Sequence, residues 1–182
     1  MGADNLSQLC TLANATYRVH PKLMIHTGGG ISFGCRPVYC KSSKQKLNTK
    51  SSTEAEVVGV SDYLLFSIWI CLFMAAQGYD IKNNILFQDN QSAIKMEKNG
   101  KTSCTGNSRH INIQYFFVKD QVDSNNMSIA YCSTEHMLAD FFTKYLQGSL
   151  FVEFCEVIVG WNTHRCISDG TALNQGVCWK CG

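Results

Sequence analysis

The sequence carries little net charge. Its 182 residues have a formal net charge of +2 and only 16% are charged, so the overall charge does not by itself indicate a nucleic-acid partner. The N-terminus also lacks the basic-then-apolar pattern of a signal peptide. With 45% hydrophobic residues, the composition is that of a globular protein, and the length fits one domain with appendages.

Cysteine, by contrast, is abundant. The ten cysteines are mostly scattered, without the regular framework of a small secreted disulfide-bonded fold. We therefore expect reduced thiols in an intracellular protein, cytoplasmic or nuclear and not secreted. Residues 63–76 are almost wholly apolar but fall short of the roughly 20 residues that a membrane-spanning helix needs. We interpret them as a buried core helix and expect no membrane contact.

The hydrophobic periodicity predicts an α/β domain with a mixed sheet. Antiparallel strands are expected first, over 6–13, 31–40 and 45–52, with Gly28 to Gly30 in a turn that permits close backbone approach. Helices are expected over 53–77, 92–98, 111–122, 134–146 and 151–161, and further strands over 85–88 and 128–132. Ser52 or Thr53 would cap the first helix, and Gly78 would end it.

The predicted domain organisation has four parts. Residues 1–6 form an N-terminal extension and residues 7–147 the α/β domain, with helices on both faces of the sheet. Residues 148–161 form a terminal helix. Residues 162–182 lose all periodicity, and we expect a disordered tail that contains cysteines.

Three acidic residues lie on separate predicted elements. Glu56 is one turn into the first long helix, where an acid also interacts favourably with the helix dipole. Asp89 follows a buried strand at the carboxyl edge of the sheet, where it could bind a ligand or cap the next helix. Asp140 lies among apolar residues, where it needs a metal, or faces solvent and pairs with Lys144. Three such acids are what a two-metal phosphoryl-transfer site requires.

Two further groups of residues could bind ligands. Basic side chains that could hold phosphates, or simply form a solvated hairpin and a helix start, are Lys41, Lys44, Lys46, Lys50, Arg109 and His110. Four potential zinc ligands in the tail are His164, Cys166, Cys178 and Cys181. Because one residue separates the first two of these ligands, their spacing departs from that of zinc fingers, and we do not expect Zn²⁺.

Five motifs occur in a fixed order: Lys41–Lys46, Ser51–Glu56, Gln88–Ile94, Ser108–Ile111 and Ala139–Lys144. With them, residues 7–160 resemble the ribonuclease H domain at the C-terminal end of copia-type retrotransposon Pol polyproteins. The resemblance implies a ribonuclease H-like fold and endonucleolytic hydrolysis of the RNA strand of RNA·DNA hybrids, with carboxylates binding two Mg²⁺. It also implies descent from a polyprotein that contains reverse transcriptase, with a hybrid or other nucleic acid as partner.

By this resemblance Glu56, Asp89 and Asp140 match three of the four metal-binding acids of the family. The fourth acid should end the first strand, where the family reads Asp-Ala-Ser-Tyr, but this sequence has Asn14-Ala15-Thr16-Tyr17. Asn14 lacks the negative charge of the acid expected to bridge both metals, so Mg²⁺ affinity and catalysis should be impaired. The alternatives are a non-catalytic nucleic-acid-binding module and an inactive remnant of such an element.

Overall fold

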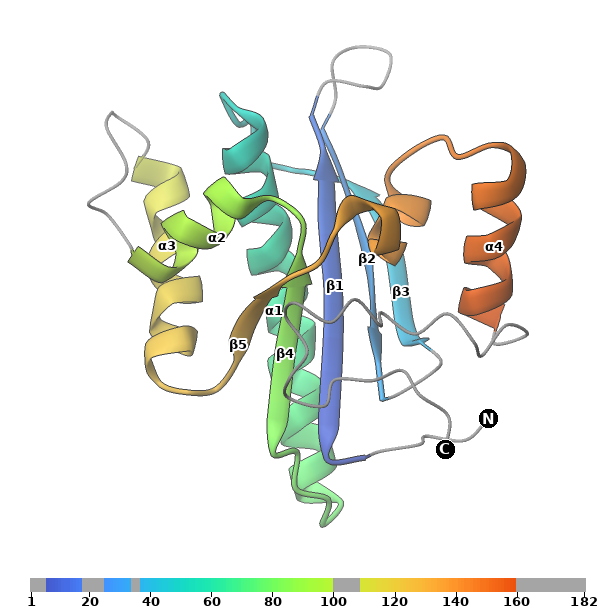
Figure 1. Cartoon of the computed structure of the whole chain (residues 1–182). Helices are drawn as coiled ribbons and strands as arrows, with labels where there is room; N and C mark the ends of the chain where they lie inside the picture. Colours follow the sequence, from blue (N-terminus) through green and yellow to red (C-terminus); the bar gives the residue numbers. More distant parts are fainter. Residues whose placement is uncertain (1–5, 18–24, 34–36, 100–108, 160–182) are drawn as a thin grey trace.

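The structure is a computed structural model that describes residues 6–17, 25–33, 37–99 and 109–159, drawn in colour in Figure 1. The tail expected at 162–182, its candidate zinc ligands and most of the N-terminal extension lie outside the described residues. The described cysteines that are free thiols are Cys10, Cys40, Cys71, Cys132 and Cys155.

A five-stranded mixed sheet forms the centre of the domain (Figure 1). Its strands are β1 (Gln8–Thr16), β2 (His26–Ser32), β3 (Pro37–Lys44), β4 (Asn83–Gln88) and β5 (Ser128–Tyr131). They lie in the order β3-β2-β1-β4-β5; β1 to β3 are antiparallel, and β4 and β5 run parallel to β1. The predicted mixed sheet is therefore confirmed.

Two groups of helices pack on this sheet. The first group is α1 (Ser52–Ala76), α2 (Gln91–Asn99) and α3 (Arg109–Asp123). The second is the pair of 3-10 helices η3 (Thr134–His136) and η4 (Leu138–Phe142), followed by α4 (Gly148–Val159). In Figure 1 the second group lies in front of the sheet and to its right, whereas α1 lies behind it. The predicted helices on both faces are present.

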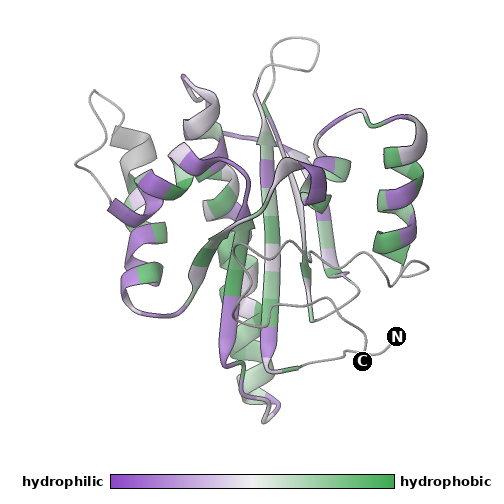
Figure 2. Cartoon of the chain, in the orientation of Figure 1, coloured by the Kyte–Doolittle hydropathy of each residue, from purple (hydrophilic) through white to green (hydrophobic). Residues whose placement is uncertain are grey.

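The alternation of side chains along β1 gives each face of the sheet its own core. Leu9 and Ala13 face α1 and pack with Val60 and Leu64. Leu12 faces the other way and packs with residues such as Met137. In Figure 2, β4 is hydrophilic where it starts and hydrophobic over the residues that follow. Strands β1 and β2 are thus buried on both sides.

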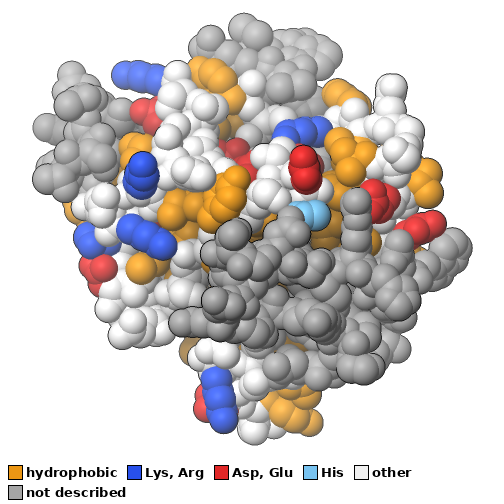
Figure 3. Space-filling view, viewed as in Figure 1, with side chains coloured by type: hydrophobic (Ala, Val, Ile, Leu, Met, Phe, Trp, Pro, Cys, Tyr) orange, Lys and Arg blue, Asp and Glu red, His pale blue; other side chains and the backbone are white. Residues whose placement is uncertain are grey.

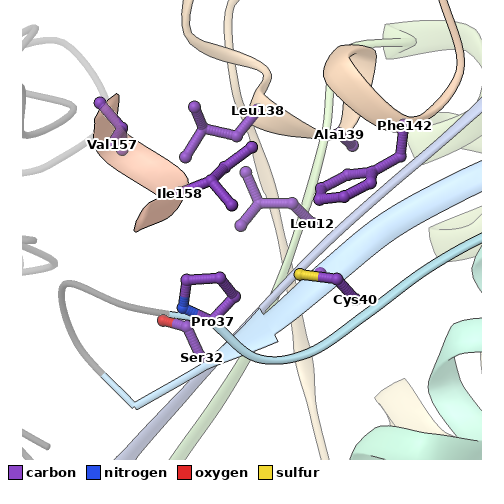
Figure 4. Close-up of a pocket in the computed structure, with 10 residues that line it drawn as sticks. Leu12, Ser32, Pro37, Cys40, Leu138, Ala139, Phe142, Val157 and Ile158 are labelled. Atoms are coloured by element: carbon purple, nitrogen blue, oxygen red, sulfur yellow. The ribbon is translucent and has the colours of Figure 1, made fainter. Parts of the chain in front are cut away.

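The second core is closed by η4 and α4. Around Leu12, the side chains of Leu138 and Phe142 come from η4, and Val157 and Ile158 come from α4 (Figure 4). This small apolar pocket anchors α4 to the domain, because the helix buries its apolar side there.

Side chains of Ser51 and Glu54 cap the start of helix α1. The Ser51 side chain accepts a hydrogen bond from the Glu54 backbone N–H at 3.2 Å, and the Glu54 carboxylate accepts one from the Lys50 N–H at 2.7 Å. The N-cap is therefore Ser51, and the prediction of Ser52 or Thr53 is wrong by one or two residues. The helix ends at Ala76, and Gly78 follows with a positive φ of 85°, as predicted.

The three glycines at 28–30 lie inside β2, so the turn predicted for them is wrong. Gly29 pairs with Ala13, and a Cβ added at Gly28 would lie 2.6 Å from the carbonyl oxygen of Phe142. The close approach expected of these glycines is real: Gly28 makes room for η4 on the strand, and a Cβ added at Gly29 would lie 2.0 Å from the carbonyl oxygen of Leu12 in β1. The strand predicted over 31–40 is also wrong, since it covers the end of β2 and the start of β3. Residues 45–51, after the end of β3 at Lys44, form a connection instead of the strand predicted at 45–52.

Helix α1 is long and apolar enough to cross a membrane by length and composition alone, the one such helix among the described residues. Half of its apolar window is buried within the protein, however, where Val60 and Leu64 pack on the sheet. A core helix passes the same test. The other side of α1 carries exposed apolar residues.

Candidate acidic centre

Asn14, Glu56, Asp89 and Asp140 converge where β1 and β4 end, and we call these four residues the acidic centre. The Asn14 amide donates a hydrogen bond to the Asp140 carboxylate, and the backbone N–H of Ala15 donates one to Glu56 at 3.0 Å. The charge of Asp89 acts on both Glu56 and Asp140, raising the pKa of each. The sequence prediction thus selected residues that the fold brings together.

Glu56 is buried, with only 6% of its surface exposed. Burial and the neighbouring charge of Asp89 raise its pKa well above the usual range, against the opposing effect of hydrogen bonds from the Ala15 N–H and the Gln88 side chain. Glu54 is engaged instead in capping α1. The choice of Glu56 over Glu54 as the site residue therefore agrees with the geometry.

Asp89 does not cap α2. That role belongs to Asn90, whose side-chain oxygen accepts hydrogen bonds from the N–H groups of Ser92 at 3.0 Å and Ala93 at 3.1 Å. The Asp89 carboxylate accepts a hydrogen bond from the Thr134 hydroxyl at 3.2 Å. The capping alternative for Asp89 is wrong, and its carboxylate remains part of the acidic centre.

Asp140 lies in η4, and the α-helix predicted over 134–146 is wrong. Met137 interrupts the helix with φ −75° and ψ 86°, because both Met137 and Ala139 are buried in the core that contains Leu12. Asp140 is only 4% exposed, yet it also forms an ion pair with Lys144, N to O 2.6 Å. Asp140 is therefore a buried acid, and the alternative in which it faces solvent is wrong, although the pairing with Lys144 that this alternative invoked is present.

The two carboxylate oxygens of Asp140 are both engaged. Asn14 donates to Oδ1, and Lys144 donates to Oδ2. Burial raises the pKa of Asp140, while Lys144 and the Asn14 hydrogen bond act in the opposite direction. The Asn14 amide nitrogen also lies 3.2 Å from the Thr143 hydroxyl. An aspartate at position 14 could make neither donation when ionised.

These contacts bear on whether the centre fits a pair of Mg²⁺ ions. Within the described part of the chain, no group of three or more His, Cys, Asp or Glu side chains is arranged to hold a metal ion. Asp140 has both oxygens occupied by donors, and one oxygen of Glu56 accepts from the backbone. The residues present therefore do not fit a two-metal centre in this arrangement.

Sequence reasoning missed a buried pair behind Glu56. Gln88 and Glu97 are both fully buried, and with its amide oriented to donate, Gln88 reaches the two Glu97 oxygens at 3.0 and 3.3 Å. Burial raises the pKa of Glu97 to about 8. The spacing of Glu97 after the buried Ala93 places both on the inner side of α2, a signal that could have identified it.

The basic residues do not form one patch with this centre. Lys41, Lys44 and Lys46 are exposed on or after β3. Lys41 lies over the Phe66 ring, 5.4 Å from its centroid, on the α1 side of the strand, and the alternation of the strand places Lys44 on the opposite side. On the face drawn in Figure 3, the visible Lys and Arg side chains are scattered.

Arg109 and His110 stand at the start of α3, but their side chains lie outside the described residues. Their position at the start of the helix is known from the backbone, and their contacts lie outside the described residues.

No protein-family profile matches the sequence. The chain is similar to the retrovirus-related Pol polyprotein from transposon TNT 1-94 of Nicotiana tabacum, with 29% identity over 142 residues and 78% of this chain covered. It is also similar to that from transposon RE1 of Arabidopsis thaliana, with 32% identity over 136 residues and 74% of this chain covered. The chain spans only 10% and 9% of the lengths of these relatives.

Solved ribonuclease H structures resemble the fold. LC11-RNase H1, isolated from compost, gives a TM-score of 0.54 at 9% identity, covering 75% of this chain and 92% of that one. The same protein in complex with an RNA/DNA hybrid gives a TM-score of 0.53 at 9% identity, covering 71% of this chain and 88% of that one. The N-terminal ribonuclease H domain of a Mycobacterium tuberculosis protein gives a TM-score of 0.51 at 10% identity, covering 82% of this chain and 97% of that one. At these identities the likeness concerns the fold.

Proposed function

We propose that this chain, a ribonuclease H-like domain related to the Pol polyproteins of copia-type retrotransposons, binds RNA·DNA hybrids but hydrolyses them poorly or not at all. The ancestral activity would be Mg²⁺-dependent endonucleolytic cleavage of the RNA strand. The impairment resides in Asn14.

The observation that carries the proposal is the hydrogen bond from Asn14 to Asp140. With aspartate at position 14, two buried carboxylates would face each other, and their repulsion would favour a bound cation or a shared proton. The asparagine amide instead satisfies Asp140 with a neutral donor, and Lys144 supplies a positive charge from within the chain. The demand for a metal ion at this position is thereby reduced.

Two-metal hydrolysis requires carboxylate oxygens that are free to bind both ions. In the ancestral site Glu56, Asp89 and Asp140 would be the metal ligands together with the acid that Asn14 replaces. We infer that the present set binds Mg²⁺ weakly, because it has lost one negative charge and because both oxygens of Asp140 already accept a hydrogen bond.

Hybrid binding through contacts to backbone phosphates would not require the metal ions. LC11-RNase H1, which shares this fold, was solved in complex with an RNA/DNA hybrid. On our proposal Lys44 and Lys46, with Arg109 and His110, contact backbone phosphates, which fixes the position of a duplex without reading its sequence. Lys41, on the α1 side of β3, takes no part in this contact. Such binding should weaken steeply as salt increases.

The test compares the wild-type chain with Asn14→Asp, with the double variant Asn14→Asp/Asp89→Asn, and with the matched control Asp120→Asn on the exposed side of α3. Cleavage of a labelled RNA·DNA hybrid is measured with Mg²⁺ and with a chelator. We expect Mg²⁺-dependent cleavage in Asn14→Asp alone, by at least about 100-fold over wild type, because one missing metal ligand typically disables such a site. Robust cleavage by the wild type would refute the proposed impairment.

Binding is measured on the same proteins by fluorescence anisotropy. Salt-dependent hybrid binding by every variant, with turnover in neither wild type nor Asn14→Asp, would favour a purely non-catalytic binding module. A chain that shows neither binding nor cleavage would be an inactive remnant, and the proposed function would be wrong.

A further inference from the structure

The outer side of α1 carries a continuous row of large apolar side chains that the fold leaves exposed. We call this row the α1 stripe; its members and their exposed fractions are Leu65 (58%), Phe66 (36%), Trp69 (61%), Leu72 (66%) and Phe73 (49%). Their spacing of three, four and seven residues puts them on one side of the helix. Because the opposite side of α1 is buried on the sheet, this helix is apolar all round, which is typical of a helix that is covered on both sides.

A groove runs beside the α1 stripe. It has a volume of about 750 Å³, and its far wall is formed by Phe33, Val38 and Tyr39 at the edge of the sheet. The aromatic rings that border it are ordered by contact: Tyr39 stacks on Phe66 with centroids 4.6 Å apart, and Trp69 stacks on Phe73 at 5.4 Å. The surface is therefore an apolar ridge next to an apolar hollow.

The area of this surface is close to the area that one partner buries in a protein–protein interface. From the areas that aromatic and aliphatic side chains bury, the exposed part of the α1 stripe with Val38 amounts to roughly 600 Å², at the upper limit of the largest patch on a typical monomer. A standard interface buries about 800 Å² on each partner. The patch, once a polar rim is added, has the area that one side of a stable dimer needs.

We propose that this surface joins two copies of the chain in a symmetric dimer. A two-fold axis brings the same patch of each copy against the other, so a surface pairs well with itself when it offers both a ridge and a hollow. About an axis near Trp69, the α1 stripe of each copy enters the groove of its partner. Trp69, the largest exposed side chain of the stripe, lies at the centre of the contact.

Charges at the margin agree with a protein interface. Lys41 lies over the face of Phe66. Burial raises the pKa of Asp62, one turn before the stripe, while the nearby charges of Lys41 and Lys46 act in the opposite direction. An apolar centre with a charged rim is the usual anatomy of an interface between proteins. Insertion of α1 into a membrane, by contrast, would pull Val60 and Leu64 out of the core of the domain.

The experiment measures the mass of the whole chain in solution, by light scattering and sedimentation, under reducing conditions. Three proteins are compared: wild type, Leu72→Lys in the α1 stripe, and Ile113→Lys on α3, where an equally exposed apolar residue (70%) lies away from the stripe. We expect wild type and Ile113→Lys to form a dimer at micromolar concentration. For Leu72→Lys we expect the dissociation constant of the dimer to be at least ~10-fold higher, because a buried unpaired charge disrupts an interface.

Trp69→Ser provides a second variant, and far-ultraviolet circular dichroism establishes that each protein is folded. A folded wild-type chain that stays monomeric at about 200 µM would overturn the proposal, since a dissociation constant above that value means no stable dimer. A dimer that survives both stripe variants would also overturn it, as would flotation of the folded wild type with lipid vesicles instead of self-association. The result is independent of hybrid cleavage, because no residue of the α1 stripe belongs to the acidic centre.

Discussion

Glu97 makes the stability of this protein depend on pH in an unusual direction. The residue is fully buried, its contact is the Gln88 amide, and its pKa is raised to about 8 from an ordinary value of 4.5. The folded protein therefore retains a proton that the unfolded chain releases. The contribution of Glu97 to the free energy of unfolding is fully present below pH 4.5. It is lost as the pH rises to 8, because the native state binds more protons than the unfolded chain over that window. We predict that Glu97→Gln removes this dependence.

The size of the effect follows from the pKa values. Between the two pKa values, each pH unit costs about 1.4 kcal/mol of folding free energy. From pH 5 to pH 7 the wild type should therefore lose about 2–3 kcal/mol relative to Glu97→Gln. At pH 5 the two proteins should be similar, because a neutral glutamine amide replaces a neutral carboxylic acid of nearly the same shape.

The assay is urea unfolding followed by circular dichroism at pH 5, 6 and 7, with reductant present. Exposed Glu135→Gln is the matched control and should run parallel to the wild type at every pH. If the free-energy difference between wild type and Glu97→Gln is the same at pH 5 and pH 7, Glu97 does not titrate in this range and the reasoning about its burial is wrong.

Three other substitutions test the fold and the ion pair. Lys144→Met should destabilise the protein by about 1–3 kcal/mol at pH 7, because Asp140 loses its charged partner, and the loss should shrink as acid protonates Asp140; urea unfolding at pH 7 and pH 4 measures both. Gly28→Ala should lower the free energy of unfolding by about 1–3 kcal/mol in thermal or urea unfolding, since its Cβ would meet the Phe142 backbone at 2.6 Å. Ser51→Ala should cost about 1 kcal/mol by the same assay, through loss of the α1 cap, and no change would show that the cap is dispensable.

The fold was largely predictable from patterns that act locally. The long apolar helix with Gly78 after it, and the short apolar strand before Asp89, have strong periodicity and clear ends. The glycines at 28–30 misled because local propensity treats them as a break, whereas here Gly28 allows η4 to approach β2 and Gly29 lies close to the backbone of β1. These tertiary contacts are not visible in sequence.

The acidic centre was predictable for a different reason. Glu56 and Asp89 stand at ends of elements that the fold brings together, but each also had a purely structural interpretation, and it was the resemblance that selected them. The 3-10 form of η4 around Asp140 was not predictable, because it results from the burial of Met137. Glu97 was overlooked since a charged residue in a helix is expected to face solvent.

The central claim is that the Asn14 amide takes the place of a metal ion beside Asp140. Titration calorimetry of Mg²⁺ against wild type and Asn14→Asp, at the same pH and salt, tests it most directly. We predict that Asn14→Asp binds Mg²⁺ at least ~10-fold more tightly, since it restores a negative oxygen ligand and removes the competing donor. Equal Mg²⁺ affinity in the two proteins would contradict the account.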